Sequence, residues 1–365
     1  MADAAEIERH VGTEAPTGPV PKPELGQHFA LDAAAQQEIE RVLPVKGSKL
    51  IETRHYGRSL WGQTGKLTAQ LPDGSDRHYF FKTASESSVG RTAQKMITAE
   101  IAGLDAIRAV SPSFAPEAHG WGAYRDQVTS STTYFLVTSF CDIGLQPPAP
   151  HTFAAQLANL HKSSVSPTGK FGLDEAPCHA TIWYTVITWQ SSWTTLFRDI
   201  LAYTIHLSQQ QHEGHDSYAE FQKLSDLVLD EVVPRLLGPL EGKIKPCLIH
   251  GDLWDENTAT DTATGEPFVF NPMAFYAHNE YEIGNWRAAR HRLSGKEYVD
   301  AYKECFPPDE PAEEWDDRNL LYSLRFDSAA AVLIPGSNLR EIVRDNMKAL
   351  CNKYCHLDKV RAILG

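Results

Sequence analysis

The sequence lacks any apolar run of membrane-spanning length and any basic run of the kind that follows a phosphate backbone. Its 34 basic and 47 acidic residues give a formal net charge of −13, which argues against a nucleic-acid partner or an anionic membrane surface. The first twelve residues carry acids where a signal or transit peptide carries bases. These absences predict a cytoplasmic protein with no nucleic-acid and no membrane partner.

Several common site motifs are also absent. The six cysteines form no CxxC pair and no zinc-like ligand set, which predicts reduced and mostly buried thiols. No GxSxG nucleophile elbow occurs. The run from His212 to His215 is one residue short of the HExxH zinc motif. Neither a GxGxxG loop nor a Walker loop is present, so a nucleotide site must be built from other residues.

The chain of 365 residues suits two lobes better than one small core. Residues 17–23 hold three prolines and a glycine, which is linker composition, so residues 1–27 are predicted to be flexible. Strand patterns dominate up to residue 140, and helical patterns dominate after a Pro-rich break at 146–150. We therefore expect an α+β chain with a small N-lobe at 28–141 and a larger C-lobe at 142–365.

Individual elements follow from periodicity and turn residues. Leu67 to Leu71 alternates, Pro72-Asp73-Gly74 turns, and Arg77 to Lys82 runs back, which predicts a β-hairpin. Further strands are expected at 121–124 and 133–140, and a short strand pair is expected to frame residues 250–257 and 268–272. Helices are expected at 31–43, 91–109, 152–162, 192–207 and 218–237, with several more after 295.

The most informative stretch is His250-Gly251-Asp252-Leu253-Trp254-Asp255-Glu256-Asn257, followed by the apolar strand Phe268 to Phe270 and Asn271-Pro272. Asp252 can accept the proton of an attacking hydroxyl, and the amide oxygen of Asn257 can reach a metal on the phosphates. The residue after the apolar strand is an Asp that holds Mg²⁺ in active kinase-like enzymes, and here it is Asn271. The spacing indicates phosphoryl transfer, with Asn271 at the position where an active enzyme has the metal-binding Asp.

A second group lies in the strand-rich third. Lys82 ends a strand and Glu100 lies on the next expected helix, an arrangement that can fix a lysine on the α- and β-phosphates. Alone, such a lysine is more often a solvated edge charge, but Asp252 and Asn257 downstream favour the functional interpretation. Gly57 and Gly62 bound a turn that either covers phosphates or is a plain hairpin turn.

These residues together resemble the fructosamine kinase (ketosamine-3-kinase) family, a branch of the protein-kinase-like fold near the aminoglycoside phosphotransferases. The resemblance covers roughly residues 50–355 and includes features similar to the fungal members. It is carried by Phe80-Phe81-Lys82, Glu100 to Leu104, Leu157 to His161, Lys170-Phe171-Gly172, His250 to Trp254 and Phe275 to Glu282.

The resemblance implies a bilobal fold, with a small antiparallel-sheet N-lobe that carries one key helix and a mainly helical C-lobe. It implies ATP- and Mg²⁺-dependent phosphorylation of the 3-hydroxyl of a ketosamine on lysine or protein amines, which leads to deglycation. The roles it implies are a base (Asp252), phosphate holders (Lys82 and Glu100), metal ligands (Asn257 and the Asn271 position), an adenine-facing hinge (Ser139, Phe140 and Cys141) and sugar neighbours (Trp254, His278 and Glu280).

Asn271 departs from the family, because an amide oxygen can coordinate Mg²⁺ but brings no negative charge. Three explanations stay open: a natural pseudokinase, an impaired variant of an active kinase, or compensation by Asp255 or Glu256. Two other functions also remain, namely a nucleotide-, sugar- or partner-binding module and a kinase of another small hydroxylated metabolite. The Phe275 to Glu282 segment argues against the latter.

Overall fold

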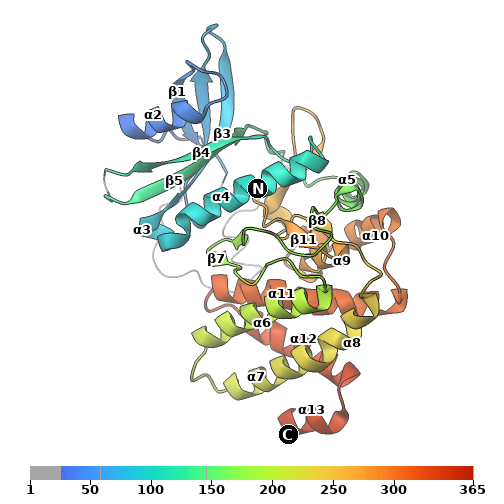
Figure 1. Cartoon of the computed structure of the whole chain (residues 1–365). Helices are drawn as coiled ribbons and strands as arrows, with labels where there is room; N and C mark the ends of the chain where they lie inside the picture. The colour runs from blue at the N-terminus through green and yellow to red at the C-terminus, as the bar shows by residue number, and fades with distance from the viewer. Residues whose placement is uncertain (1–25, 58, 128, 145, 365) are drawn as a thin grey trace.

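A computed structural model describes residues 26–57, 59–127, 129–144 and 146–364. Apart from Gly26 and Gln27, the segment 1–27 that was predicted to be flexible lies outside these residues, so that prediction is untested. Figure 1 shows a strand-rich part at the top of the molecule and a helical part below it. The predicted α+β, bilobal architecture is confirmed, whereas the exact lobe boundary at residues 141/142 stays a prediction.

The N-lobe is one antiparallel sheet with the strand order β1-β2-β3-β5-β4. The predicted hairpin is confirmed, since Leu67 of β2 pairs with Tyr79 of β3. Its turn forms because Gly74 adopts a φ of +85°, and Asp73 accepts a hydrogen bond from the Ser75 amide at 2.9 Å. The strands are β1 (Lys49–His55), β2 (Thr64–Gln70), β3 (Asp76–Ser85), β4 (Ala118–Arg125) and β5 (Thr132–Ser139).

Two helices complete the N-lobe. Helix α2 (Ala33–Val42) begins at Asp32, whose side chain accepts from the Ala35 amide, and it buries Ile39 against the sheet core of Leu67, Tyr79 and Phe81. Helix α4 (Ala93–Val110) follows the short helix α3 (Glu86–Val89) and buries Ile97 with Leu136 of β5. Figure 1 shows α4 running along the sheet toward the C-lobe.

The second half of α4 belongs to another core. Leu104 and Ile107 pack with Phe153 and Leu157 of α5 (Pro150–Ser163), so this helix ties the sheet to the C-lobe. Gly103 allows the close approach. A Cβ there would lie 2.8 Å from Pro272 Cγ, so α4 contacts the segment that carries Asn271 directly.

We predict that Gly103→Ala lowers the free energy of unfolding by about 1 kcal/mol. Alanine normally stabilises a helix interior by up to about 1 kcal/mol over glycine, but overpacking against the rigid proline ring costs about 1–3 kcal/mol. The matched control is Gly238→Ala, because no heavy atom lies within 4 Å of a Cβ at that position. Urea unfolding of both variants tests this, and a Gly103→Ala protein more stable than the parent would refute the close contact.

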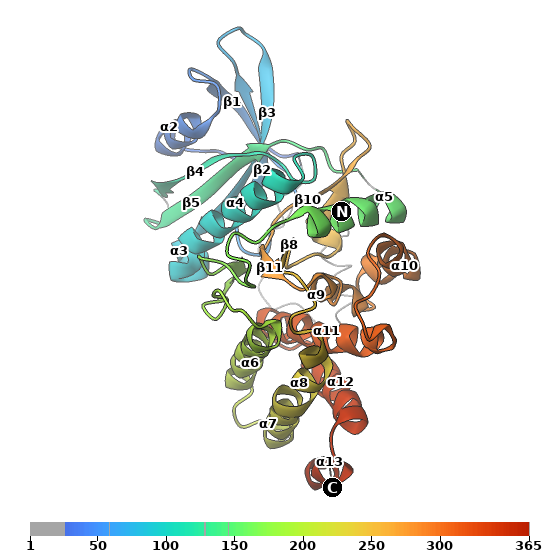
Figure 2. The same ribbon diagram turned by 45° about the vertical axis from the view of Figure 1, so that its right-hand side comes forward.

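The C-lobe is mainly helical, as predicted, and Figure 2 shows most of its helices below the strands β8 (Cys247–Ile249) and β11 (Phe275–Ala277), with α5 above them. One expected helix is divided: α7 (Tyr218–Leu227) passes through a π-helical turn, Val228–Val232, into α8 (Val233–Leu237). Pro234 explains the irregularity, since it has no N–H for a regular helix. The other helices are α6 (Trp193–Gln211), α9 (Asn279–Glu282), α10 (Lys296–Cys305), α11 (Trp315–Leu333), α12 (Leu339–Tyr354) and α13 (Leu357–Leu364).

Two pairs of short strands flank the loops that carry Asp252, Asn257 and Asn271. Strand β8 (Cys247–Ile249) pairs with β11 (Phe275–Ala277), and β9 (Thr258–Thr260) pairs with β10 (Pro267–Val269). The predicted strand pair around the two motifs is confirmed. A small hairpin, β6 (Cys178–His179) and β7 (Ile182–Trp183), lies between α5 and α6.

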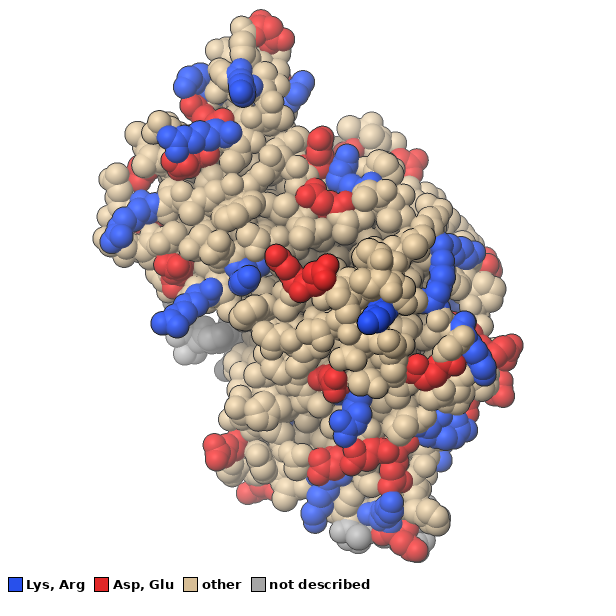
Figure 3. Space-filling model, in the orientation of Figure 1, with Lys and Arg blue, Asp and Glu red and all other residues tan. Residues whose placement is uncertain are grey.

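The surface agrees with the acidic composition. In Figure 3, basic and acidic side chains are interspersed, and no continuous basic stripe crosses the face shown. Among the described residues, no helix has both the length and the apolar character needed to cross a membrane.

Candidate active site

The loop after β8 depends on Gly251. Its φ is +79°, and a Cβ at this position would lie 2.2 Å from the carbonyl oxygen of Met273, so no other residue fits. His250 steadies the loop: its Nε2 donates to the Phe270 carbonyl at 2.9 Å, and its Nδ1 accepts from the Asp252 amide at 3.3 Å. The turn thereby places the buried side chain of Asp252 beside Asn257 and His179.

The predicted site residues from both lobes form one line of hydrogen bonds. Lys82 Nζ lies 2.6 Å from Glu100 Oε2 and 2.6 Å from Asn271 Oδ1. Asn271 Nδ2 donates to Asn257 Oδ1 at 3.2 Å, and Asn257 Nδ2 donates to Asp252 Oδ2 at 3.0 Å. Residues far apart in the sequence are thus brought together from β3, α4 and the two loops of the C-lobe.

This line is largely removed from water. The side chains of Lys82 and Glu100 are 13% and 9% exposed, so their ion pair acts in a medium of lower dielectric than the surface. Asn271 adopts a φ of +58°, in the left-handed region that Asn and Asp tolerate better than other residues with side chains. The backbone at position 271 would therefore accept an aspartate as well.

Asp252 is held in its ionised form. Burial alone would raise the pKa of this carboxyl, but the nearby His179, His250 and Arg325 lower the pKa to about 2. Arg325 is fully buried on α11, and its guanidinium carbon lies 4.6 Å from the centroid of the Tyr184 ring. The Asp252 carboxyl is therefore ionised at neutral pH.

The donor set suits a hard cation only in part. Asn257 Oδ1 and Asn271 Oδ1 are oxygen donors of the type that Mg²⁺ takes, and their side chains lie next to each other. Neither contributes charge, and at present Lys82 and the Asn271 amide hydrogens engage these oxygens. The residues therefore fit Mg²⁺ with one negative charge fewer than an Asn and Asp pair would supply.

Asp255 is not placed to compensate for that charge. Its two carboxylate oxygens accept hydrogen bonds from the backbone amides of Arg292 and Leu293, at 2.6 and 3.0 Å, so it ties the loop after β8 to this later segment. Compensation by Glu256, which is partly buried in the same short helix, stays a hypothesis.

Gly57 and Gly62 lie in the connection between β1 and β2, as predicted. Gly57 has a φ of +74°, and a Cβ on Gly62 would lie 1.8 Å from the Thr83 carbonyl oxygen, so the turn packs tightly onto β3 beside Lys82. Both interpretations of this turn, phosphate cover or plain connection, stay open.

The predicted hinge residues lead out of β5. Ser139 Oγ is 3.0 Å from His119 Nε2, and the Phe140 ring packs against Tyr56 with a centroid distance of 4.8 Å. Burial raises the pKa of the Cys141 thiol to about 11, which agrees with a packing role. The Tyr56 hydroxyl, which accepts from the Ile143 amide at 2.7 Å, joins this linker to the N-lobe. An adenine-facing role for these residues stays a prediction.

The three predicted sugar neighbours are not equivalent. Trp254 is half-buried, with its ring centroid 5.4 Å from that of His291, and its contact with a sugar stays a prediction. His278 is fully buried and bonds to the Tyr322 hydroxyl and the Asp309 carboxylate at 2.9 and 2.8 Å. Its ring therefore has no nitrogen left for a ligand.

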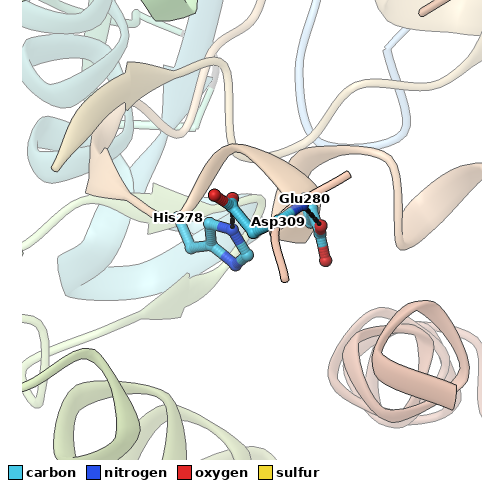
Figure 4. Close-up of side chains that lie close together, drawn as sticks. All are labelled: His278, Glu280 and Asp309. Carbon is cyan, nitrogen blue, oxygen red and sulfur yellow. Dashed lines mark hydrogen bonds and ion pairs between the residues drawn. The ribbon is translucent and has the colours of Figure 1, made fainter. Parts of the chain in front are cut away.

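The polar atoms of Glu280 are also engaged by the protein. Both of its carboxylate oxygens are engaged by the Arg318 guanidinium, at 2.7 and 2.8 Å, and the side chain is 1% exposed. The polar atoms of His278 and Glu280 are thus engaged by Tyr322, Asp309 and Arg318, and a place for these two residues near a sugar stays a prediction. Figure 4 shows both side chains with Asp309, and the ligand-type atoms of the three lie within 4.8 Å. Arg318 already supplies the cation there, so they do not form a metal site.

Residues that the sequence did not reveal also support the site. The buried Glu282 carboxylate accepts from the backbone amides of His250 and Gly251, the latter at 2.9 Å. His179 on β6 lies against Asp252. Glu282 belongs to the Phe275 to Glu282 segment and could have been noticed there, whereas nothing in the sequence joins residue 179 or 325 to residue 252.

Two lobes that share a lysine–glutamate pair and an aspartate after a His-Gly turn define a phosphotransferase of the protein-kinase-like class. The fructosamine kinase family model matches residues 55–349, and the chain belongs to this family of kinase-type phosphotransferases. That match agrees with the resemblance seen in the sequence, although the fungal-type detail stays a prediction.

Individual relatives agree. The chain is 26% identical over 328 residues to the chloroplastic protein-ribulosamine 3-kinase of Oryza sativa subsp. japonica, covering 88% of this chain and 87% of that protein. It is 30% identical over 248 residues to the protein of the same name from Arabidopsis thaliana, covering 67% and 68%.

Solved structures share the fold. A putative fructosamine-3-kinase from Haemophilus somnus 129PT superposes with a TM-score of 0.68 at 18% identity, over 86% of this chain and 97% of that one. A thermostable mutant of an aminoglycoside phosphotransferase, in ternary complex with AMP-PNP and hygromycin B, gives a TM-score of 0.52 at 14% identity, over 86% and 97%.

Proposed function

We propose that this protein transfers the γ-phosphoryl group of ATP to the 3-hydroxyl of a ketosamine, a fructosamine or ribulosamine on lysine or protein amines, and that this step leads to deglycation. We further propose that Asn271 slows it and that the protein acts in the cytoplasm. The observation that supports transfer most strongly is the continuous line of hydrogen bonds from Glu100 through Lys82, Asn271 and Asn257 to Asp252.

Each residue has a separate task in this proposal. Glu100 holds the Lys82 ammonium, which binds the α- and β-phosphates. Asp252 accepts the hydroxyl proton as the acceptor oxygen bonds to the γ-phosphorus and the bond to ADP breaks. Mg²⁺, held by Asn257 and Asn271, would neutralise phosphate charge. Since such catalysis is mainly positioning and electrostatics, a missing charge lowers the rate without removing the site.

The test is a substrate panel. We expect the chain to transfer radiolabelled phosphate from ATP to ribulose-lysine or fructose-lysine with Mg²⁺ or Mn²⁺, and not to lysine, an aminoglycoside or choline. Transfer to an aminoglycoside or choline alone would favour a kinase of another small metabolite. No transfer by a chain shown to be folded would contradict the proposal.

A second candidate is a pseudokinase that binds a nucleotide, a sugar or a protein partner, and Asn271 is the observation that favours it. Lys82 interacts with the Asn271 oxygen, so the lysine occupies the place that a metal ion would take on this oxygen. Under this second hypothesis a nucleotide binds without Mg²⁺. Thermal-shift titration with ATP separates the two, because an enzyme is stabilised more when Mg²⁺ is present, whereas metal-independent binding without turnover indicates the pseudokinase.

A further inference from the structure

His179 lies beside the proposed base although it comes from a distant part of the chain. It ends strand β6, in a hairpin of two short strands between α5 and α6. Its Nε2 is 3.3 Å from Asp252 Oδ1, and each of the two side chains is 11% exposed. The contact is therefore part of the interior of the site and does not belong to the surface.

The contact completes the support of the carboxylate. Asn257 Nδ2 donates to Asp252 Oδ2 at 3.0 Å, so with His179 each carboxylate oxygen has one protein donor. An ionised carboxylate only accepts, so the His179 nitrogen that faces it carries the hydrogen. Two donors on opposite oxygens fix the rotation of the carboxylate plane, which a single donor would leave free.

The fold determines the charge state or the hydrogen-bond partners of the other titratable groups around His179 and Asp252. Burial lowers the pKa of His291 to about 3 and raises that of Tyr184 to about 12, so both are neutral near pH 7. His250 is occupied by the Phe270 carbonyl and the Asp252 amide. Arg325 places Nη2 on the sulfur of Met273, and among the described residues it acts on Asp252 through its charge and not through a hydrogen bond.

The hairpin is attached to both lobes. The Trp183 indole nitrogen donates to the Ala176 carbonyl at 3.1 Å, and the Tyr203 hydroxyl of α6 donates to the Trp183 carbonyl at 3.1 Å. From the N-lobe, Lys95 Nζ lies 5.5 Å from the centroid of the Trp183 ring. Lys95 is on α4, the helix that also carries Glu100, so one helix adjoins both the phosphate-binding lysine and the support of the base.

We propose that His179 is a positioning residue that orients Asp252 toward the acceptor hydroxyl, and that the β6–β7 hairpin links this orientation to α4. The inference rests on the proposed function for its catalytic consequence. It assigns a role in the reaction to a residue outside the His250 to Asn257 and Asn271 motifs. His179 itself exchanges no proton and contacts no phosphate.

Two substitutions separate the hydrogen bond from packing. His179→Gln places an amide donor near the position of the imidazole Nε2, whereas His179→Leu fills space without a donor. We expect kcat for ketosamine phosphorylation to fall about 10- to 100-fold in His179→Leu. In His179→Gln, kcat should return most of the way to the parental value. KM for ATP should change less than about twofold in both variants. His212→Leu, at the far end of α6, is the matched control and should keep the parental kcat.

A second measurement does not depend on turnover. Hydrogen exchange of the peptide covering residues 247–258 should be faster in His179→Leu than in the parent, and close to parental in His179→Gln. Equal kcat and equal exchange in all three chains would overturn the inference and leave the proposed function intact. If no chain shows turnover, the proposed function fails, and the exchange comparison alone confirms or refutes the contact.

Discussion

Asn271→Asp is expected to raise the rate of ketosamine phosphorylation by about 10- to 100-fold at limiting Mg²⁺. In the present chain the Asn271 amide nitrogen donates to Asn257 Oδ1, so a hydrogen-bond donor occupies the side that would face the proposed Mg²⁺. An aspartate would direct two acceptor oxygens and one extra negative charge to this point, and a hard cation favours that arrangement. The φ of +58° at position 271 lies in the region that Asp also tolerates, so the backbone accepts the substitution.

The measurement is the initial rate over a Mg²⁺ titration, with the thermal midpoint of each protein recorded alongside. Asn271→Gly is the control, because it also removes the amide, adds no charge and accepts the φ of +58°, and it should be slower than the parent. A rate for Asn271→Asp at or below the parental rate, in a folded protein, would show that the site is not limited by charge at this position.

Asp252→Asn is expected to lower kcat about 10²- to 10⁴-fold, the range for loss of a general base. The amide cannot accept the hydroxyl proton, and its NH₂ group must face either Asn257 Nδ2 or His179 Nε2, which are both donors to the present carboxylate. KM for ATP should change little, because Lys82 and Glu100 are not altered.

The comparison is with Asp73→Asn, the same chemical change in the exposed turn between β2 and β3, which should leave kcat unchanged. Steady-state rates with saturating ATP give the answer. An Asp252→Asn protein with more than about a tenth of the parental kcat would require a different proton acceptor, and the assignment of the base would be abandoned.

Much of this architecture was accessible from the sequence because it is encoded locally. Turn residues and alternation gave the β2–β3 hairpin, and helical periodicity gave α4. The motif from His250 to Asn257 needs Gly251 for steric reasons, so its presence indicates the loop geometry directly. The line from Lys82 to Asp252 follows from these elements once the lobes pack as in related folds.

The remainder depends on long-range packing that no local pattern encodes. His278 and Glu280 have the chemistry of ligand-binding residues, but α11 supplies Tyr322 and Arg318, which engage their polar atoms. His179 reaches Asp252 only because the β6–β7 hairpin folds back between the lobes.

The most direct test is ³¹P NMR of the chain incubated with ATP, Mg²⁺ and ribulose-lysine. The account predicts a new phosphomonoester signal assigned to the 3-oxygen, followed by release of free lysine, and a faster appearance with Asn271→Asp. Unchanged ATP and substrate with both folded proteins, after thermal shifts have confirmed nucleotide binding, would contradict it.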